Sequence, residues 1–295
     1  MRQAILITAY HDSAQLQRLI DYFDSDFEIF IHVDRHSNLN LNGHILASNV
    51  HIYSRYSTPW GSVNHLNAIL LLICEAARHQ NLDYFHLVTG NDYPIPPLSV
   101  FKNFCETHRN ENYLEFFPLP RTAWDGEGGM ERINYYWLQH WLQPTRNSVG
   151  YQLTTMLIKI QRKIGLKRPF NYFNNHLYGG GTYWSISRAM INHTIEYLDG
   201  HPDYLRRFHM TKIAEEIFLP NLWVNSGLPL TNNSLRYMDW HSDGASPKIL
   251  DENDYDKLVS SGALFARKIQ SGISDILIKK LIEQHNSSTT CYHAD

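Results

Sequence analysis

Short apolar runs alternate with longer amphipathic segments through the first third of the chain. Four of the runs have the length and composition of buried strands: 4–8, 27–34, 50–54 and 84–89. Between them, residues 12–23 and 62–79 carry apolar side chains at helical spacing. Strands separated by helices predict an α/β fold, with a mainly parallel central sheet flanked by helices.

Polar residues gather where the predicted strands end. Tyr10 and His11 follow the first strand, Asp34 ends the second, and the turn residues GNDYP, which include Asp92, follow the fourth. Ligands of open α/β sheets bind beyond the carboxyl ends of the parallel strands. These four residues are therefore candidate ligand contacts.

The second half of the chain is less regular. Residues 112–117 are typical of a strand, and residues 177–187 of a glycine-rich turn that enters a strand. The three glycines lack the spacing and the lysine of a phosphate-binding loop, so a close backbone approach or a simple turn explains them equally well. The tail, 285–295, has no apolar periodicity and is predicted to be disordered.

Residues 154–169 form a candidate basic amphipathic helix. One interpretation is a solvated helix face, and the other is peripheral contact with an anionic membrane surface or a lipid-linked substrate. No apolar run approaches the roughly 20 residues needed to cross a bilayer. We therefore expect a cytoplasmic protein, and a peripheral position at the inner face of the cell membrane stays open.

The composition narrows the function classes. A chain of 295 residues that is 43% hydrophobic can bury one large core or two small ones. Its net charge of −3 argues against a nucleic-acid partner, which a basic patch normally accompanies. The three cysteines have neither paired metal-ligand spacing nor the density of a disulfide scaffold, which indicates a reducing compartment.

Two adjacent carboxylates, Glu215 and Glu216, lie in the otherwise apolar segment KIAEEIFLPN. Charged groups are rarely buried without a partner or a function. The simplest interpretation is a pair of acids in the first turn of a helix, where the helix dipole favours negative charge. A catalytic carboxylate is the alternative.

Eight segments, taken in order, form a recognisable set: AYHDSAQLQRLIDYF, FEIFIHVD, TPWGSVNHLNAILLLICEA, FHLVTGNDYPI, GGGTYWSISRAMI, AEEIFLPNL, LRYMDW with SPKIL, and SGALFARK. In these segments the chain resembles the family of core-2/I-branching β-1,6-N-acetylglucosaminyltransferases and peptide O-xylosyltransferases. The resemblance spans residues 4–282 and is greatest to the short bacterial members.

The resemblance implies an inverting glycosyltransferase with a single GT-A-type nucleotide-sugar-binding domain over residues 1–284. Its nucleotide-binding half would span residues 1–110, and its acceptor and catalytic half residues 111–284. The implied donor is a UDP-sugar, GlcNAc- or xylose-like. The implied acceptor is a hydroxyl of a glycan or lipid-linked glycan, in the synthesis of bacterial surface polysaccharide or lipid-linked oligosaccharide.

The resemblance also implies that no metal or other cofactor is needed. The TGNDYP loop offers Asp92 without a second acid two positions before it, so an Asp-x-Asp metal motif is missing there. His32 and Asp34 have the spacing of a ligand pair, but His32 can equally point away from the site while Asp34 points into it. Fixed cations must then stabilise the diphosphate leaving group. By the family motifs these are Arg236 and Lys268.

The family supplies its catalytic base from the motif that holds Glu216. Inversion by direct displacement requires a base that takes the proton of the attacking acceptor hydroxyl. Burial among neighbouring apolar residues should raise the pKa of Glu216 and keep it a useful base near neutral pH. Glu215 then bonds the backbone at the helix start or a nearby cation.

The remaining assignments follow the resemblance position by position. Asp34 would contact the nucleoside, Tyr10 and His11 the uracil or ribose, and Asp92 the donor. Trp60 either packs beside the nucleotide or seats the long helix that follows it. Two residues are expected to contact the acceptor sugar, with core packing as the alternative for the second: Glu115 and Trp184.

Two other function classes compete with a glycosyltransferase. The first is a non-catalytic nucleotide- or carbohydrate-binding protein on a degenerate transferase fold. The presence of Glu216, Arg236 and Lys268 together argues against it. The second is a metal-dependent phosphatase or nuclease, which the scattered histidine spacings do not support.

Overall fold

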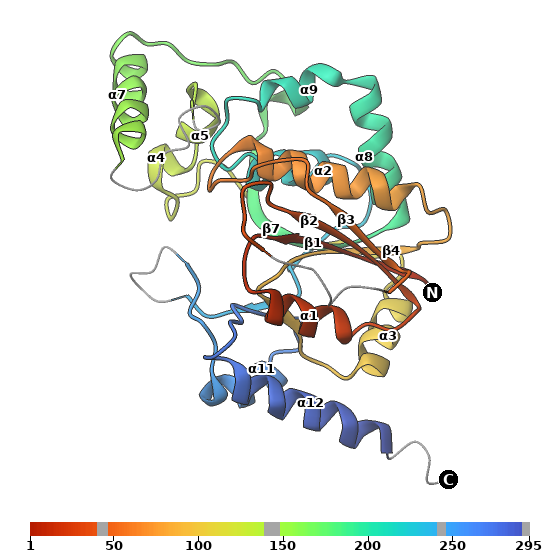
Figure 1. Ribbon diagram of the computed structural model, residues 1–295. Helices are drawn as coiled ribbons and strands as arrows, with labels where there is room; N and C mark the ends of the chain where they lie inside the picture. The colour runs from red at the N-terminus through yellow and green to blue at the C-terminus, as the bar shows by residue number, and fades with distance from the viewer. Residues whose placement is uncertain (40–46, 139–147, 241–245, 291–295) are drawn as a thin grey trace.

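The computed structural model describes residues 1–39, 47–138, 148–240 and 246–290. A seven-stranded sheet forms its centre, and only one strand of it runs against the others (Figure 1). In spatial order the strands are β3 (Val50–Tyr53), β2 (Phe27–Val33), β1 (Gln3–Ala9), β4 (Tyr84–Thr89), β7 (Tyr178–Ser187), β6 (Tyr113–Pro118) and β8 (Thr231–Asn232). The antiparallel strand is β7. The predicted α/β class with a mainly parallel sheet is confirmed.

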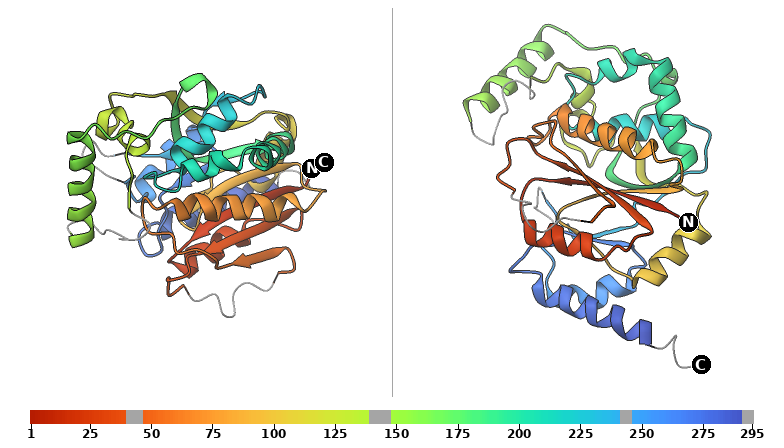
Figure 2. Two further views of the ribbon diagram at one scale, coloured as in Figure 1. Left: turned by 90° about the horizontal axis from the view of Figure 1, so that it is seen from above. Right: turned by 45° about the vertical axis from the view of Figure 1, so that its right-hand side comes forward.

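Helices cover both faces of this sheet (Figures 1 and 2). Helices on one face are α2 (Val63–Ala77), α8 (Arg188–Gly200), α9 (Pro202–Arg207) and α10 (Glu215–Val224). Two of the largest fully buried side chains meet edge to face between this helical layer and the sheet. They are Trp184 of β7 and Trp223 of α10, and their ring centroids lie 5.3 Å apart. The opposite face carries α1 (Ser13–Asp21) and α3 (Leu98–Thr107).

A third layer is built from the end of the chain. A small sheet of β5 (Asp92–Pro94), β10 (Phe265–Arg267) and β9 (Arg236–Met238) lies beside α11 (Tyr255–Ser260) and α12 (Asp275–Thr290). Since β5 directly follows β4, this layer joins the carboxyl edge of the main sheet. A short 3-10 turn, Glu252–Asp254, leads into α11.

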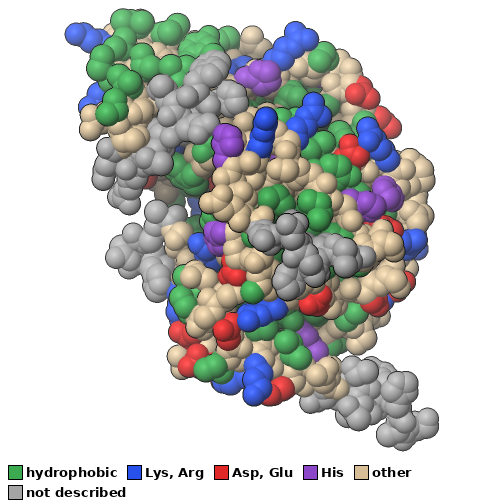
Figure 3. Space-filling model, in the orientation of Figure 1, with side chains coloured by type: hydrophobic (Ala, Val, Ile, Leu, Met, Phe, Trp, Pro, Cys, Tyr) green, Lys and Arg blue, Asp and Glu red, His purple; other side chains and the backbone are tan. Residues whose placement is uncertain are grey.

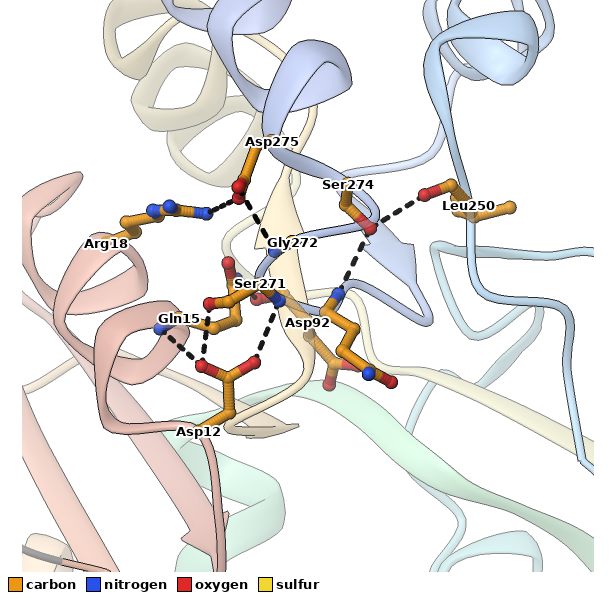
Figure 4. Close-up of polar contacts among 10 residues, drawn as sticks. Asp12, Gln15, Arg18, Asp92, Leu250, Ser271, Gly272, Ser274 and Asp275 are labelled. Atoms are coloured by element: carbon orange, nitrogen blue, oxygen red, sulfur yellow. Dashed lines mark hydrogen bonds and ion pairs between the residues drawn. The ribbon is translucent and has the colours of Figure 1, made fainter.

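The turn between β10 and α12 is fastened to α1 by side-chain bonds (Figure 4). Asp12, the N-cap of α1, accepts hydrogen bonds from the backbone N–H and the hydroxyl of Ser271 at 2.9 and 2.7 Å. Arg18 of α1 pairs with Asp275 at 2.6 Å. These contacts fix the segment that follows Arg267 against the first helix.

Between β6 and β7 the chain forms short helices and one longer one that stands apart from the sheet (Figure 1). They are α4 (Asp125–Gly128), α5 (Glu131–Asn134), α7 (Val149–Lys163) and the 3-10 turn Phe173–Asn175. Helix α7 starts earlier and ends earlier than the predicted 154–169. No helix of the described residues is long and apolar enough to span a membrane.

Two sequence predictions are wrong in this fold. The glycines of 177–187 lie inside β7 rather than in a turn. Of the two explanations left open for them, the close backbone approach is confirmed, because a Cβ on Gly180 would come within 2.1 Å of the Glu115 carbonyl oxygen. The predicted disordered tail is helical as far as Thr290, because Leu277, Ile278 and Leu281 anchor α12 in the third layer. Residues 291–295 lie outside the described residues.

Candidate active site

The carboxyl ends of three parallel strands meet the start of α10 and the end of β10. The backbone N–H of Asp34, after β2, bonds Ala9 O at 2.9 Å, and that of Gly90, after β4, bonds Thr8 O at 3.0 Å. On the other side, Ile213 N–H bonds Gly61 O at 3.0 Å, which fixes the segment before α10 to the loop before α2. Most of the predicted site residues lie around this junction.

Glu216 lies in the first turn of α10, half-buried and paired with a single cation. Its Oε2 lies 2.6 Å from Arg132 Nη1, and the Arg132 guanidinium stacks 3.9 Å above the centre of the Trp124 ring. Burial raises the pKa of Glu216 to about 7, although Arg132 opposes the shift. The carboxylate therefore has the proton affinity expected of a base at neutral pH.

Glu215 pairs with a histidine that the sequence analysis missed. His65 Nδ1 of α2 lies 2.9 Å from Glu215 Oε1, while Glu215 Oε2 is buried without a hydrogen-bond partner. Burial lowers the pKa of His65, but the Glu215 carboxylate outweighs it, so that the pKa is raised. The nearby cation expected for Glu215 is thus His65, which also lies 3.5 Å from Thr8 Oγ1.

A second cation missed by the sequence analysis is Arg267, next to the predicted Lys268. Its guanidinium bonds Asp92 Oδ1 at 2.8 Å and the Thr89 hydroxyl, and lies 4.8 Å from the Tyr183 ring centre. Asp92 is fully buried and also accepts the Thr89 N–H at 2.7 Å. Asp92 therefore positions Arg267, and its geometry does not favour the predicted contact with the donor.

Lys268 follows directly and is half-buried. Among the described residues no side chain is hydrogen-bonded or ion-paired to its ammonium group. Burial and the neighbouring Arg267 lower its pKa. Its charge in turn lowers the pKa of His11, after the larger effect of burial. Lys268 and Arg267 therefore place two positive charges beside the end of β1.

Arg236 lies in the core, and its position argues against the predicted role in binding diphosphate. Its two terminal nitrogens bond the carbonyls of Leu87, Trp184 and Ser234 and the hydroxyl of Ser185. Its guanidinium also lies 4.7 Å from the Phe265 ring centre. All four terminal N–H groups are used within the protein, so none is left for a ligand.

The side chains of Asp34 and His32 both accept hydrogen bonds from protein groups. His32 is buried, and its Nε2 accepts the backbone N–H of Tyr56 at 3.1 Å. Asp34 accepts the N–H and, at 2.8 Å, the hydroxyl of Thr58, and the His36 N–H at 2.8 Å. These bonds hold the pKa of Asp34 low against the opposing effect of burial.

Three aromatic side chains flank the junction. Tyr10 is 56% exposed and meets His11 edge-on, with ring centroids 4.1 Å apart. Trp60 is 71% exposed, so it does not seat the long helix, and Lys212 Nζ lies 5.3 Å from its ring centre. These exposed rings are free to stack on a ligand.

The two predicted acceptor residues have different surroundings. Trp184 is fully buried in the core, which excludes direct contact with a sugar. Glu115 lies at the rim of a pocket of about 470 Å³ together with Phe117 and Arg121, at the edge formed by β6 and β8. Arg121 lies 3.9 Å from Glu115 and 4.0 Å from the Phe117 ring centre. A half-buried ring beside charged hydrogen-bonding groups is the kind of surface that suits a sugar.

The sequence matches the family model of the Core-2/I-branching enzymes over residues 4–258. The chain belongs to this family. Membership confirms the resemblance seen in the sequence and the GT-A-type α/β class that it implied, and it makes the protein a glycosyltransferase.

The family assignment rests on that sequence match, since the likeness to solved structures is weak. Mouse xyloside xylosyltransferase 1 in its apo form shares 7% identity, with 90% of this chain and 96% of that chain covered and a TM-score of 0.38. A structure described as a "Putative Glucose-1-Phosphate Thymidylyltransferase from Bacillus anthracis in Complex with a Sucrose" shares 10% identity, with 78% and 86% covered and a TM-score of 0.34. No curated protein matches the chain.

Proposed function

We propose that this glycosyltransferase inverts the anomeric centre of a UDP-sugar, GlcNAc- or xylose-like, with Glu216 as its base. The observation that supports this most directly is the half-buried Glu216 carboxylate, whose pKa of about 7 suits it to accept a proton at neutral pH. The acceptor hydroxyl would lose its proton to Glu216 as its oxygen attacks the anomeric carbon. The bond from that carbon to the UDP oxygen breaks in the same step.

The departing diphosphate needs positive charge that is oriented in advance. Lys268 and Arg267 supply it in this proposal, and Arg267 replaces Arg236 of the sequence prediction. Arg267 is fixed by Asp92 and Thr89, while the ammonium of Lys268 has no side-chain partner among the described residues. Asp92 and Asp34 are already occupied by protein donors, which supports stabilisation by side-chain cations rather than by a metal held on these acids.

The nucleoside would lie at the ends of β1 and β2, beside Tyr10, His11 and Asp34. Trp60 would stack on the donor or the acceptor. The pocket at Glu115 is the candidate for the acceptor glycan, in the synthesis of a bacterial surface polysaccharide or lipid-linked oligosaccharide. Its support is the half-buried Phe117 ring beside Arg121 and Glu115 in the lining of the pocket.

We also propose that α7 places the enzyme against an anionic membrane, where a lipid-linked acceptor would be met. The helix exposes aliphatic side chains at helical spacing: Val149, Leu153, Met156, Ile160 and Ile164. It buries Thr154, Ile158 and Gln161, and no acidic residue occurs from 149 to 169. The space-filling view shows this apolar surface with blue side chains beside it (Figure 3). An exposed apolar stripe among basic residues is typical of interfacial helices.

Thermal stabilisation by candidate donors tests the proposed substrate class. UDP, UDP-GlcNAc and UDP-xylose should raise the melting temperature in the presence of EDTA, because a ligand that binds only the folded state stabilises it. The productive donor should then be consumed in transfer, with the opposite anomeric configuration in the product. Binding without any transfer or hydrolysis would favour the non-catalytic alternative. Binding restored only by Mn²⁺ or Mg²⁺ would contradict the role of Lys268 and Arg267.

A further inference from the structure

A cluster of three metal-ligating side chains lies away from the active site. Glu28 is near the start of β2, His51 is near the start of β3, and His79 follows the end of α2. One nitrogen or oxygen from each of them lies within 4.8 Å of the other two, and all three residues are half-buried. Among the described residues no other group of three or more His, Cys, Asp or Glu side chains lies as close together.

The fold brings the three together on the face of the sheet that α2 covers. Strands β2 and β3 pair in parallel with Phe30 opposite His51, and Glu28 lies on the same face as Phe30 because side chains alternate along a strand. The Phe30 ring stacks on His51 at 4.7 Å and meets His79 edge-on at 5.2 Å. A fully buried phenylalanine thus holds both imidazoles beside the carboxylate.

We propose that Glu28, His51 and His79 bind a transition-metal ion such as Zn²⁺. Two imidazole nitrogens and one carboxylate oxygen are a common set of three protein ligands for zinc, with water as the fourth ligand. Two bonds of about 2.1 Å at a tetrahedral angle would place ligand atoms about 3.4 Å apart. His51 Nε2 and Glu28 Oε2 are already 2.9 Å apart, and small side-chain rotations close the wider separations.

The second oxygen of Glu28 is already engaged. Arg2 donates a hydrogen bond to Glu28 Oε1 at 2.7 Å, which leaves Oε2 toward the histidines. Carboxylates that bind a metal are usually hydrogen-bonded in this way, and the bond fixes their orientation. Arg2 also offsets the negative charge of the carboxylate when no ion is bound.

An ion at this position would stabilise the fold and would not take part in the reaction. Glu28 and Asp34 lie at opposite ends of β2, six residues and therefore about 20 Å apart. The ion would join the edge strand β3 to β2 and to the end of α2. A chelator could therefore lower the stability of the enzyme without removing any group from the active site.

Calorimetric titration of the full chain with ZnCl₂ tests the site. The parent should bind one Zn²⁺ that His51→Gln and His79→Gln each weaken by about 10-fold or more, the scale seen when the surroundings of a metal are disturbed. His209→Gln, which removes an exposed histidine elsewhere, is the matched control and should bind as the parent does. Circular dichroism of each variant separates loss of the site from loss of the fold.

Co²⁺ gives a second readout that does not depend on stability. The parent with Co²⁺ should show the strong visible absorption of a four-coordinate ion, and His51→Gln and His79→Gln should lose it. Parent protein that takes up no Zn²⁺, or folded ligand variants that bind Zn²⁺ and Co²⁺ as the parent does, would overturn the proposal. Neither result would affect the proposed transferase activity, because its test is made in the presence of EDTA.

Discussion

At the scale of single residues, the pH dependence of transfer should report the ionisation of Glu216. Only the carboxylate can accept a proton, so kcat/KM should fall about tenfold per pH unit below about 7. The alkaline limb should lie below the usual range of a lysine, because burial and Arg267 lower the pKa of Lys268. A profile measured from pH 5 to 10 that stays flat down to pH 5 would contradict the assignment of the base.

The Glu215–His65 pair should contribute to stability rather than to the rate. Glu215→Gln removes the carboxylate that holds the His65 imidazole and favours its charged form, so we expect the free energy of unfolding to fall by roughly 1–3 kcal/mol, less than for a fully buried pair because His65 is partly exposed. The expected loss of stability is larger than the loss on removing an acid that interacts only with the N-terminus of a helix.

The coupling within this pair should depend on pH. The folded-state pKa of His65 is raised, so its contribution is complete below about 6.5, the unfolded value, and is lost as the pH rises through the folded value. A double-mutant cycle with His65→Gln, measured by urea unfolding at pH 6 and pH 9, should show a larger coupling at pH 6. Equal couplings at both pH values would show that no charge on His65 is involved.

The prediction of Glu216 as the base rests on a local motif of the sequence. Its Arg132 partner lies 84 positions away and His65 lies 150 positions from Glu215, so no spacing rule could have paired them. The same lack of long-range information explains why Arg236 was predicted to bind the diphosphate. Its late-strand motif matched the family, but only the folded chain shows that three carbonyls and a hydroxyl surround its guanidinium.

At the scale of elements, the end of β10 and the residue that follows it carry the proposed diphosphate contacts. Lys268→Ala removes a charge-assisted hydrogen bond, usually about 1.5–3 kcal/mol, so UDP affinity should fall by about 10- to 100-fold. Transfer should fall further, since the leaving group carries more charge in the transition state. Lys257→Ala on α11, an exposed lysine of the same layer, is the control for calorimetry. Equal UDP affinities in both variants would place Lys268 outside the site.

Strands and helices with strong periodicity were predictable, and the exceptions have physical causes. The runs at 4–8, 27–34 and 84–89 form strands that are buried between two helical layers, and the run at 50–54 forms the partly exposed edge strand β3. The three consecutive glycines of β7 are typical of a turn when the sequence is considered alone. In the folded chain they are needed because β6 and α10 approach the strand closely. The polar end of α12 is helical because His285 bonds the carbonyl of Ile95 at 3.0 Å.

At the scale of the whole molecule, α7 exposes a stripe of apolar side chains to solvent. Met156→Glu places a charge in the middle of its exposed apolar stripe, and binding to vesicles of phosphatidylglycerol and phosphatidylcholine should weaken about tenfold or more. Thr155→Glu adds the same charge on another side of the helix, away from the stripe, and serves as the control. If vesicle sedimentation shows the same loss of binding for both variants, the contact with the membrane is purely electrostatic. If the parent does not bind the vesicles, the membrane proposal is wrong.

The overall architecture was the most predictable level, because alternating strands and helices leave few arrangements of a parallel sheet. The composition gave no sign of the third layer, in which β5, next to the active site, pairs with β10 from the end of the chain. That pairing places Arg267 beside Asp92 across 175 positions of sequence. Long-range pairing of this kind determines the proposed diphosphate site.

The base role of Glu216 is tested most directly by comparing transfer in the parent and in Glu216→Gln, with saturating donor and EDTA at pH 8. The amide keeps the shape of the side chain but cannot accept the proton, so the rate should fall by about 10²-fold or more. UDP affinity, measured by calorimetry, should stay within about twofold of the parent, because the nucleotide is held by other residues. A Glu216→Gln enzyme that transfers sugar at the parental rate would show that the reaction takes its base from elsewhere.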